Sequence, residues 1–277
     1  MSVIASQKLA RRIDRKRAGL GFLDRRLPRD ERIIGMQDRA LRRTVRIPAA
    51  HHAGQLRSYE PTHGLATRLP PVRNASTARG WTIYKNVIVS HESELEHRVS
   101  LRTQARNDVV ALHSQYPVFD YDGADGEAHT HTTDFYVEYD DHWTEALVVK
   151  HEKERAEAED VIRRIFDDPS SQVVDNIVLL TETYGSIEAL ENANMVMWSR
   201  EYHHQPDVDE LLEIVRRQPG WVRFGTLLMH TPYIDRRRAA IWRLIDVGIL
   251  FSSTGEKITE LSWLGYDPAG SATGLRG

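Results

Sequence analysis

Two short apolar runs separated by a polar turn constrain the fold of this chain more than any other feature. The first run spans residues 133–139, the second spans 145–150, and the polar turn occupies 140–142. Runs of this length, rich in valine and aromatic residues, predict two adjacent strands. Asp134 stands at the start of the first run and Lys150 closes the second. The sequence therefore predicts a sheet that brings a carboxylate and a lysine together.

The segments on either side of these runs predict a mixed α/β domain over residues 81–185. A helix is expected to begin at Ser93, and a charged amphipathic helix is expected over 151–167. The order of helix, three or four strands, helix and strand favours an α/β sandwich around a mixed sheet. The expected strands are Trp81–Tyr84, Val87–Val89, Val109–Gln115, Val118–Tyr121, Thr133–Tyr139, Glu145–Lys150 and Asn176–Thr181.

Residues 186–277 are expected to be helical until a final hairpin, which is the outline of a winged-helix domain. The hairpin would pair Ile249–Ser252 with Lys257–Leu261 across a turn. In this interpretation Asp235–Val247 is the recognition helix and Ser252–Lys257 is the wing. Its arginines would then contact DNA; the alternative is an ordinary helical lid whose arginines are solvated. The expected helices are Ile187–Trp198, Val208–Arg217, Trp221–His230 and Asp235–Val247, and the candidate DNA contacts are Arg236, Arg237 and Arg238.

Charge is distributed very unevenly along the chain. Residues 1–80 hold 18 Lys/Arg against 6 Asp/Glu, a net charge of +12, and the remainder has a net charge of −15. Five prolines in this first part disfavour long helices, so an extended basic arm is expected. Such an arm indicates a polyanion partner, most commonly nucleic acid, although it could instead fold onto its own acidic domain or onto a protein partner. The candidate DNA contacts in the arm are Arg11, Arg12, Arg15, Lys16, Arg17, Arg42 and Arg43.

Several classes of protein are excluded by composition. The chain has no cysteine, which excludes disulfides, thiolate zinc sites and cysteine nucleophiles. It has no apolar run near the roughly 18 residues that a membrane span needs, so no membrane partner is expected. There is also no Gly-rich phosphate loop and no Gly-x-Ser-x-Gly motif, which leaves nucleotide hydrolysis and serine esterase chemistry without support. These features fit a cytoplasmic protein.

The Asp134 and Lys150 pair is typical of PD-(D/E)xK phosphodiesterases, which hydrolyse phosphodiesters with bound metal ions. Magnesium prefers carboxylate, carbonyl and water oxygens, so two or three acids and one cation form the minimal site. Glu96 is a further candidate acid, although Ser93-x-x-Glu96 is also a helix capping box. In the motif an acid stands two residues before the lysine, and in this chain that position is occupied by Val148. Glu138 and Glu152 are the candidates for a relocated ligand.

The order and spacing of several motifs over about residues 80–265 resemble the TnsA endonucleases of bacterial transposons. Members of that family have a restriction-endonuclease-like N-terminal domain and a winged-helix-like C-terminal domain. The resemblance therefore implies a nuclease domain over 81–185 and a winged-helix-like domain over 186–277. It does not cover the basic and largely irregular arm expected over 1–80, which could add DNA contacts. It rests on Glu92-Ser-Glu-Leu-Glu96, Ser114-Gln115-Tyr-Pro117, Thr133-Asp134-Phe, Val148-Val149-Lys150, Leu180-Thr181-Glu182 and Glu191-Asn192-Ala193-Asn194.

The resemblance also implies a function and partners. Glu96, Asp134 and Lys150 match the family's catalytic residues, and Glu96 and Asp134 would bind Mg²⁺ or Mn²⁺. Val148 stands where the family has a glutamate or glutamine, and Thr133 stands where a proline is usual. Family members cut the non-transferred strand at transposon ends beside a TnsB transposase, and they bind the AAA+ regulator TnsC. A nucleoid-associated protein of the bacterial cytoplasm is thus expected.

Two further functions agree with the same sequence. A pseudo-nuclease would keep the fold as a DNA-binding and scaffolding subunit without cutting, because Val148 replaces an expected metal ligand. A regulator of transcription would use the predicted winged-helix region alone. Two histidine pairs, His129 with His131 and His203 with His204, are interpreted as ordinary polar residues, since no third metal ligand is evident beside either pair.

Overall fold

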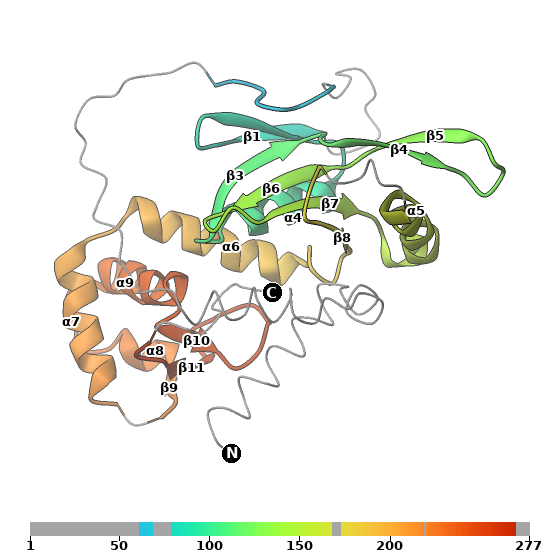
Figure 1. Cartoon of the computed structure of the whole chain (residues 1–277). Coiled ribbons are helices and arrows are strands. Elements are labelled where there is room, and N and C mark those ends of the chain that lie inside the picture. Colours follow the sequence, from blue (N-terminus) through green and yellow to red (C-terminus); the bar gives the residue numbers. More distant parts are fainter. Residues whose placement is uncertain (1–60, 69–78, 168–172, 219, 270–277) are drawn as a thin grey trace.

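The chain folds as a mixed α/β protein with mixed sheets (Figure 1). The structure is a computed structural model that describes residues 61–68, 79–167, 173–218 and 220–269. This α/β class was predicted from the sequence and is confirmed. Within the described ranges, no helix is both long and apolar enough to cross a membrane.

A four-stranded sheet forms the centre of the first part of the chain. Its strand order is β3-β6-β7-β8, antiparallel except for the parallel pair β7 and β8. A parallel pair requires a crossover connection, which is supplied here by the 3₁₀ turn η1 and helix α5. The bounds are β3 Val109–Ser114, β6 Phe135–Tyr139, β7 Thr144–Val149, β8 Asn176–Leu180, η1 Glu152–Glu154 and α5 Arg155–Asp167.

Helix α4 and two hairpins complete this part of the molecule. Helix α4 begins after its cap Ser93 and contacts β1, β2, β3 and β7, whereas α5 contacts β4 and β8. The β4–β5 hairpin extends away from the sheet at one end (Figure 1). The bounds are α4 Glu94–Gln104, β1 Gly80–Tyr84, β2 Val87–His91, β4 Val118–Asp122 and β5 Ala128–Thr132.

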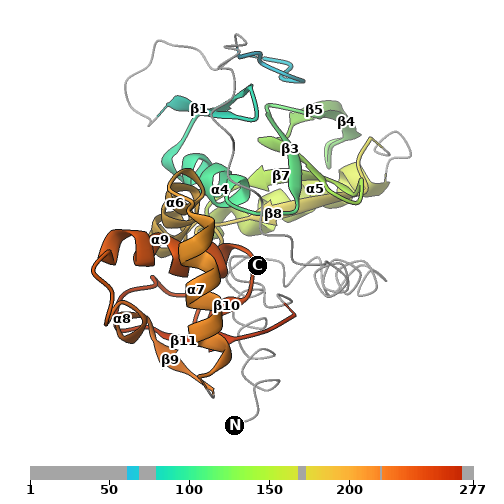
Figure 2. The ribbon, with the colours of Figure 1, turned by 90° about the vertical axis from the view of Figure 1, so that its left-hand side faces the viewer.

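The second part of the chain packs helices against a small antiparallel sheet of order β10-β11-β9 (Figure 2). Helix α9 is its central element, because it contacts α6, α7, α8 and β10 and buries most of its side chains. The bounds are α6 Ile187–Glu201, α7 Gln205–Arg216, β9 Val222–Arg223, α8 Phe224–Leu227, α9 Ile234–Asp246, β10 Leu250–Ser252 and β11 Trp263–Tyr266.

Two separate clusters of buried apolar side chains hold these parts together. One extends from Val89 to Tyr184 and includes both faces of the four-stranded sheet. The other is formed almost entirely by residues between Ala193 and Leu264. The change from one cluster to the other falls near residue 185, where the domain boundary is predicted; the independence of the two domains stays a prediction.

Arg200 on α6 joins the end of α4 to the end of α9 by hydrogen bonds and an ion pair. Its guanidinium donates to the carbonyls of Gln104 and Ala105 at the end of α4, at 3.3 and 2.5 Å. It also forms an ion pair with Asp246 at 2.7 Å, and the Asp246 side chain is 1 % exposed. Because free carbonyls at a helix end and a buried carboxylate both need donors, this one arginine stabilises both sides of the junction.

Two predictions of secondary structure in the second part are wrong. The segment 221–230 was expected to be one helix, but it forms β9 and the four-residue helix α8. The reason is tertiary: the N–H groups of Phe224 and Gly225 donate to carbonyls of Ser262 and Glu260 at 2.9 and 2.8 Å. A side chain at Gly225 would also meet the Glu260 carbonyl oxygen at 3.0 Å. Backbone bonds to a distant turn therefore replace the continuing helix.

The partner of β10 was also predicted wrongly. Lys257–Leu261 was expected to pair with it, but Trp263–Tyr266 does so. The N–H of Ile258 donates to the Asn192 side chain at 2.8 Å, and the N–H of Thr259 donates to the Ser262 hydroxyl at 2.9 Å. These bonds use the backbone donors that a strand would need, so pairing begins only after residue 262.

Replacing Arg200 with alanine is expected to lower the free energy of unfolding by about 3 kcal/mol, because it leaves the buried Asp246 with fewer donors. Chemical denaturation monitored by circular dichroism measures this change. The control is Arg216→Ala, which removes an exposed ion pair with Glu213 and should leave stability nearly unchanged. Equal effects of the two substitutions would contradict the structural role given to Arg200.

Candidate functional site

Asp134 lies immediately before β6 and is fixed against β7 by two hydrogen bonds. Its Oδ2 accepts from the N–H of Val149 at 2.7 Å, and its own N–H donates to the Leu147 carbonyl at 3.1 Å. Its other carboxylate oxygen, Oδ1, accepts no hydrogen bond from any described residue. The side chain is therefore held in one position while one oxygen stays available to a ligand.

Lys150 follows the last residue of β7, at the end where β7 and β8 run in parallel. Its N–H donates to the Leu180 carbonyl at 3.1 Å, which extends the parallel pairing by one residue. The residue is exposed. Burial raises the pKa values of Glu96 and Asp134, and the positive charge of Lys150 offsets a smaller part of that rise. The ammonium thus lies close enough to act on both carboxyl groups.

Glu96 and Ser93 form a capping box at the start of α4. Its Oε2 accepts from the N–H of Glu92 at 2.7 Å, and the Ser93 hydroxyl donates to its Oε1 at 2.8 Å. In return the N–H of Glu96 donates to the Ser93 hydroxyl at 3.1 Å. The capping interpretation is therefore confirmed. Each carboxylate oxygen still has a second lone pair, so the cap leaves acceptor capacity on this side chain.

Burial and mutual repulsion raise the pKa values of the two acids. Burial raises the pKa of Asp134 to about 7, and the neighbouring Glu96 carboxylate adds to this effect. Burial likewise raises the pKa of Glu96, and the nearby Glu92 carboxylate contributes. Because both groups are costly to ionise side by side, a cation between them would relieve the repulsion. The structure thus brings Glu96, Asp134 and Lys150 together.

The position that departs from the motif is apolar and buried. Val148 is 1 % exposed and belongs to the core of the first part of the molecule. Both acids proposed as relocated ligands are bound elsewhere. Glu138 lies 3.4 Å from His142 beside the β6–β7 turn, and Glu152 pairs with Arg155 at 2.5 Å. Neither is among the groups whose charges act on Asp134. The expectation of a relocated carboxylate therefore finds no support.

A cation fits this site only in part. The described residues contain no group of three or more histidine, aspartate or glutamate side chains that would hold a metal ion. Glu96 and Asp134 supply two hard carboxylate ligands, which suit Mg²⁺ or Mn²⁺. Remaining ligands would have to come from neutral oxygen atoms, from water or from a bound phosphate. The donor set is thus that of a weak site for a hard divalent cation.

Four neighbours of the site were not predicted as functional residues. Glu92 acts on both acids and lies 3.3 Å from Arg68, whose side chain is half exposed. Gln115 and His131 each bury a polar side-chain atom that has no hydrogen-bond partner among the described residues. Burial and the nearby Lys150 lower the pKa of His131, which favours a neutral ring. The only sequence signal was that Glu92 and Gln115 fall within the motifs of the resemblance.

The histidine pairs lie in ordinary polar surroundings. His129 lies 3.1 Å from Asp125 on the exposed β4–β5 hairpin. His131, in contrast, has a buried Nε2 atom. His203 and His204 contact Gln205 and Asp207 respectively, each at 3.0 Å. Their interpretation as ordinary polar residues stays a prediction.

The arginines of the predicted recognition helix form ion pairs within the protein. Arg236 pairs with Asp207 at 2.6 Å beside a cleft of about 290 Å³. Arg237 is 4 % exposed and pairs with Glu210 at 2.5 Å. Arg238 pairs with Glu260 at 2.6 Å. DNA contact by these three residues stays a prediction, and the burial of Arg237 favours a structural role for it.

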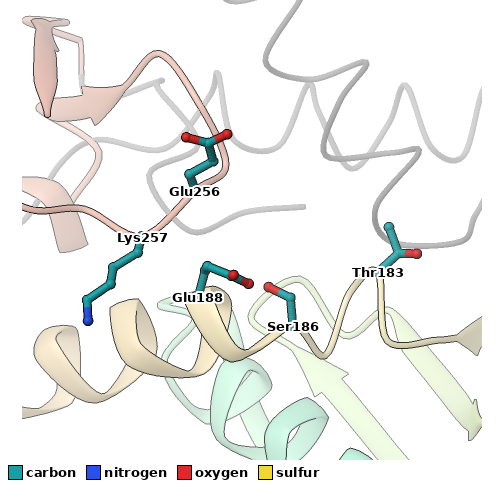
Figure 3. A pocket seen from close by; sticks show the side chains of 5 residues that line it. All are labelled: Thr183, Ser186, Glu188, Glu256 and Lys257. Carbon is teal, nitrogen blue, oxygen red and sulfur yellow. The ribbon is translucent and has the colours of Figure 1, made fainter.

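A second cleft, of about 490 Å³, opens near the end of β8 (Figure 3). The side chains of Ser186 and Glu188 point toward one another, whereas those of Glu256 and Lys257 diverge. Lys257 forms an ion pair with Glu191 at 2.7 Å, so its charge is already compensated. The described residues that line this cleft form no convergent set of catalytic groups. The site formed by Glu96, Asp134 and Lys150, called the strand-end site below, is the better candidate.

The predicted contacts of the basic arm, Arg11, Arg12, Arg15, Lys16, Arg17, Arg42 and Arg43, lie outside the described residues. Comparison with known proteins does not add an identity. No protein-family model matches this chain, and no curated protein matches it.

Glu96→Gln is expected to separate the two roles of this side chain. Glutamine can still accept a capping hydrogen bond, so stability should change by less than about 1 kcal/mol. Stabilisation by Mn²⁺, measured as a shift in melting temperature, should be lost. The matched variant Ser93→Ala should do the opposite, costing about 1 kcal/mol while the Mn²⁺ shift remains. An unchanged Mn²⁺ shift in Glu96→Gln would remove this residue from the site.

Asp134→Asn tests the raised pKa of this carboxyl group. A carboxyl whose pKa is higher in the folded state binds its proton more tightly there, so stability falls as pH rises from about 4 to about 7. Asparagine keeps the acceptor for Val149 without the charge, so its advantage should grow to about 1–3 kcal/mol at pH 8. Urea unfolding at pH 5 and pH 8 without metal measures this difference in stability between the variant and the wild type. The exposed Asp122→Asn is the control. A difference independent of pH would contradict the assignment.

Proposed function

We propose that this protein is a metal-dependent DNA endonuclease of the restriction-endonuclease-like kind. The observation that carries the proposal is the convergence of Glu96, Asp134 and Lys150, which come from a helix start, a strand start and a strand end. Two acids beside one lysine at a sheet edge suit phosphodiester hydrolysis, in which charge develops on phosphate oxygens. The basic N-terminal part of the sequence supports a nucleic-acid substrate.

The topology of both parts supports this proposal. In the first part the two helices and the four strands of the central sheet come in the order α4, β3, β6, β7, α5 and β8, with the β4–β5 hairpin inserted between β3 and β6. That order agrees with the restriction-endonuclease-like core. In the second part the succession α7, β9, α8, α9, β10 and β11, with β11 between the other two strands, agrees with a winged-helix domain. In that domain α9 would be the recognition helix.

The side chains would divide the chemistry between them. Glu96 and Asp134 would hold Mg²⁺ or Mn²⁺, which supplies an activated water and neutralises charge on the phosphate. The bond from the Val149 N–H orients the Asp134 carboxylate, and the bond from the Glu92 N–H orients that of Glu96. The exposed Lys150 ammonium would contact a phosphate oxygen and stabilise negative charge that develops there.

The resemblance to TnsA endonucleases suggests where such an enzyme would act. It supports cutting of the non-transferred strand at transposon ends, together with a TnsB-like transposase and under a TnsC-like AAA+ regulator. Location at the bacterial nucleoid in the cytoplasm is part of the same proposal. None of these partners is needed to explain the geometry of the strand-end site.

A second candidate function is a catalytically impaired subunit that binds DNA and supports the same assembly. Val148 favours it, because this buried apolar side chain stands where the motif has a metal ligand. The described residues contain no group of three or more histidine, aspartate or glutamate side chains that would hold a metal ion, which points the same way. Both candidates share a fold and a DNA partner, and they differ in whether a cation binds and the backbone is cut.

Cleavage by purified full-length protein decides between them. Supercoiled plasmid carrying a transposon end, incubated with the partner transposase and Mn²⁺, should be nicked by the wild type. Asp134→Asn and Lys150→Ala should reduce the nicking rate by about a hundredfold or more. DNA binding, measured by fluorescence anisotropy, should be retained in both variants. The exposed Lys153→Ala serves as a matched lysine control and should cut normally.

Each result assigns one function. Nicking that requires both residues supports the endonuclease, whereas DNA binding with no nicking by the wild type in Mg²⁺ or Mn²⁺ supports the impaired subunit. Val148→Glu adds a further test, because a gain of nicking in an otherwise inactive protein would locate the defect at that position.

A further inference from the structure

The carboxamide of Gln115 is a buried polar group whose hydrogen bonding is unsatisfied. Gln115 is 1 % exposed, and its Oε1 has no hydrogen-bond partner among the described residues. Leaving a buried acceptor unpaired costs about 1–3 kcal/mol, so natural proteins rarely keep one without a reason. Gln104 shows the usual arrangement, because its equally buried amide donates to Thr82 and Ser100 at 2.8 Å each.

Gln115 directly follows β3 and lies beside Asp134. Its N–H donates to the Asp134 carbonyl at 2.8 Å, which continues the pairing of Ser114 with Phe135 by one residue. The pairing of Phe135 with Leu147 places Val148 on the other side of Asp134 when continued in the same way. Gln115 and Val148 therefore stand opposite this aspartate on its two sides, one at the end of β3 and one in β7.

The backbone around Gln115 is held in an uncommon conformation. Its φ is +55°, in the left-handed region that few residues other than glycine adopt. Thr67 binds the Gln115 carbonyl twice, with its N–H at 3.1 Å and its hydroxyl at 2.7 Å. The next residue along, Arg68, pairs with Glu92 beside the acids of the site. The segment 61–68 thus fixes both Gln115 and the edge of the site.

We propose that the side-chain oxygen of Gln115 completes the cation-binding set of the strand-end site, in place of the ligand that Val148 does not supply. This inference rests on the proposed function. A glutamine oxygen is a hard neutral ligand of the kind that Mg²⁺ and Mn²⁺ accept beside carboxylates. Gln115 approaches Asp134 from β3, whereas the ligand of the usual motif approaches it from β7. The site keeps three protein ligands, of which two are charged.

Gln115→Leu tests this assignment by removing the oxygen while keeping side-chain bulk. Isothermal titration of the full-length chain with MnCl₂ should show affinity weaker than the wild type by about tenfold or more. The control Gln104→Leu replaces an equally buried glutamine at the far end of α4, and its affinity should match the wild type. Equal Mn²⁺ affinities in the wild type and Gln115→Leu would overturn the inference.

Two further variants keep the test decisive if Gln115→Leu folds poorly. Gln115→Glu adds a charge to the same ligand position, so Mn²⁺ should bind at least as tightly as to the wild type. In the double variant Gln115→Leu with Val148→Gln, affinity should recover at least threefold over Gln115→Leu alone. A purely structural role for Gln115 predicts neither result, so weakened binding in Gln115→Glu would count against the inference.

Failure of this inference is distinguishable from failure of the proposed function. If the wild type and Gln115→Leu bind Mn²⁺ equally, and Asp134→Asn does not bind it, the site stands and only the role of Gln115 is wrong. If the wild type itself neither binds Mn²⁺ nor nicks DNA, the proposed function fails, and the role of Gln115 fails with it.

Discussion

The hydrogen bond from the Val149 N–H to the Asp134 carboxylate is the interaction on which the rest of the site depends. It ties the start of β6 to the end of β7 and fixes the carboxylate close to Lys150. The parallel pairing of β7 with β8 then sets where Lys150 leaves the sheet. A shift of one residue in either register would move these side chains to opposite faces, so sheet pairing and site geometry cannot vary separately.

Local sequence patterns predicted the parts of the structure that depend on neighbouring residues. The β6–β7 hairpin, the capping box at Ser93 and Glu96 and most of the helices follow from periodicity and turn chemistry within short windows. Long-range bonds account for the errors. Asn192 binds the backbone on both sides of Lys257, accepting from Ile258 and donating to Glu256, and so displaces the strand expected there. No pattern within residues 257–261 carries that information.

The candidate site likewise combines residues that local sequence patterns reveal with residues that only long-range contacts reveal. Asp134 and Lys150 are visible in the sequence because two short strands bring them together. The importance of Gln115 is not visible, since it depends on burial, on an unpartnered oxygen and on the binding of its carbonyl by Thr67. For the arginines of α9 the sequence suggested more function than the structure supports. Their sequence cluster indicated DNA, but Arg237 is buried against Glu210.

Glu96 and Asp134 repel one another, and among the described residues the lysine whose charge acts on both is Lys150. Ionising both acids is therefore costly unless a further cation joins them. The most direct test is a crystal of the full-length protein soaked in MnCl₂, with anomalous difference density measured at the manganese edge. One strong peak is expected in contact with the carboxylates of Asp134 and Glu96. A peak elsewhere, or none at saturating Mn²⁺ with both side chains ordered, would contradict it.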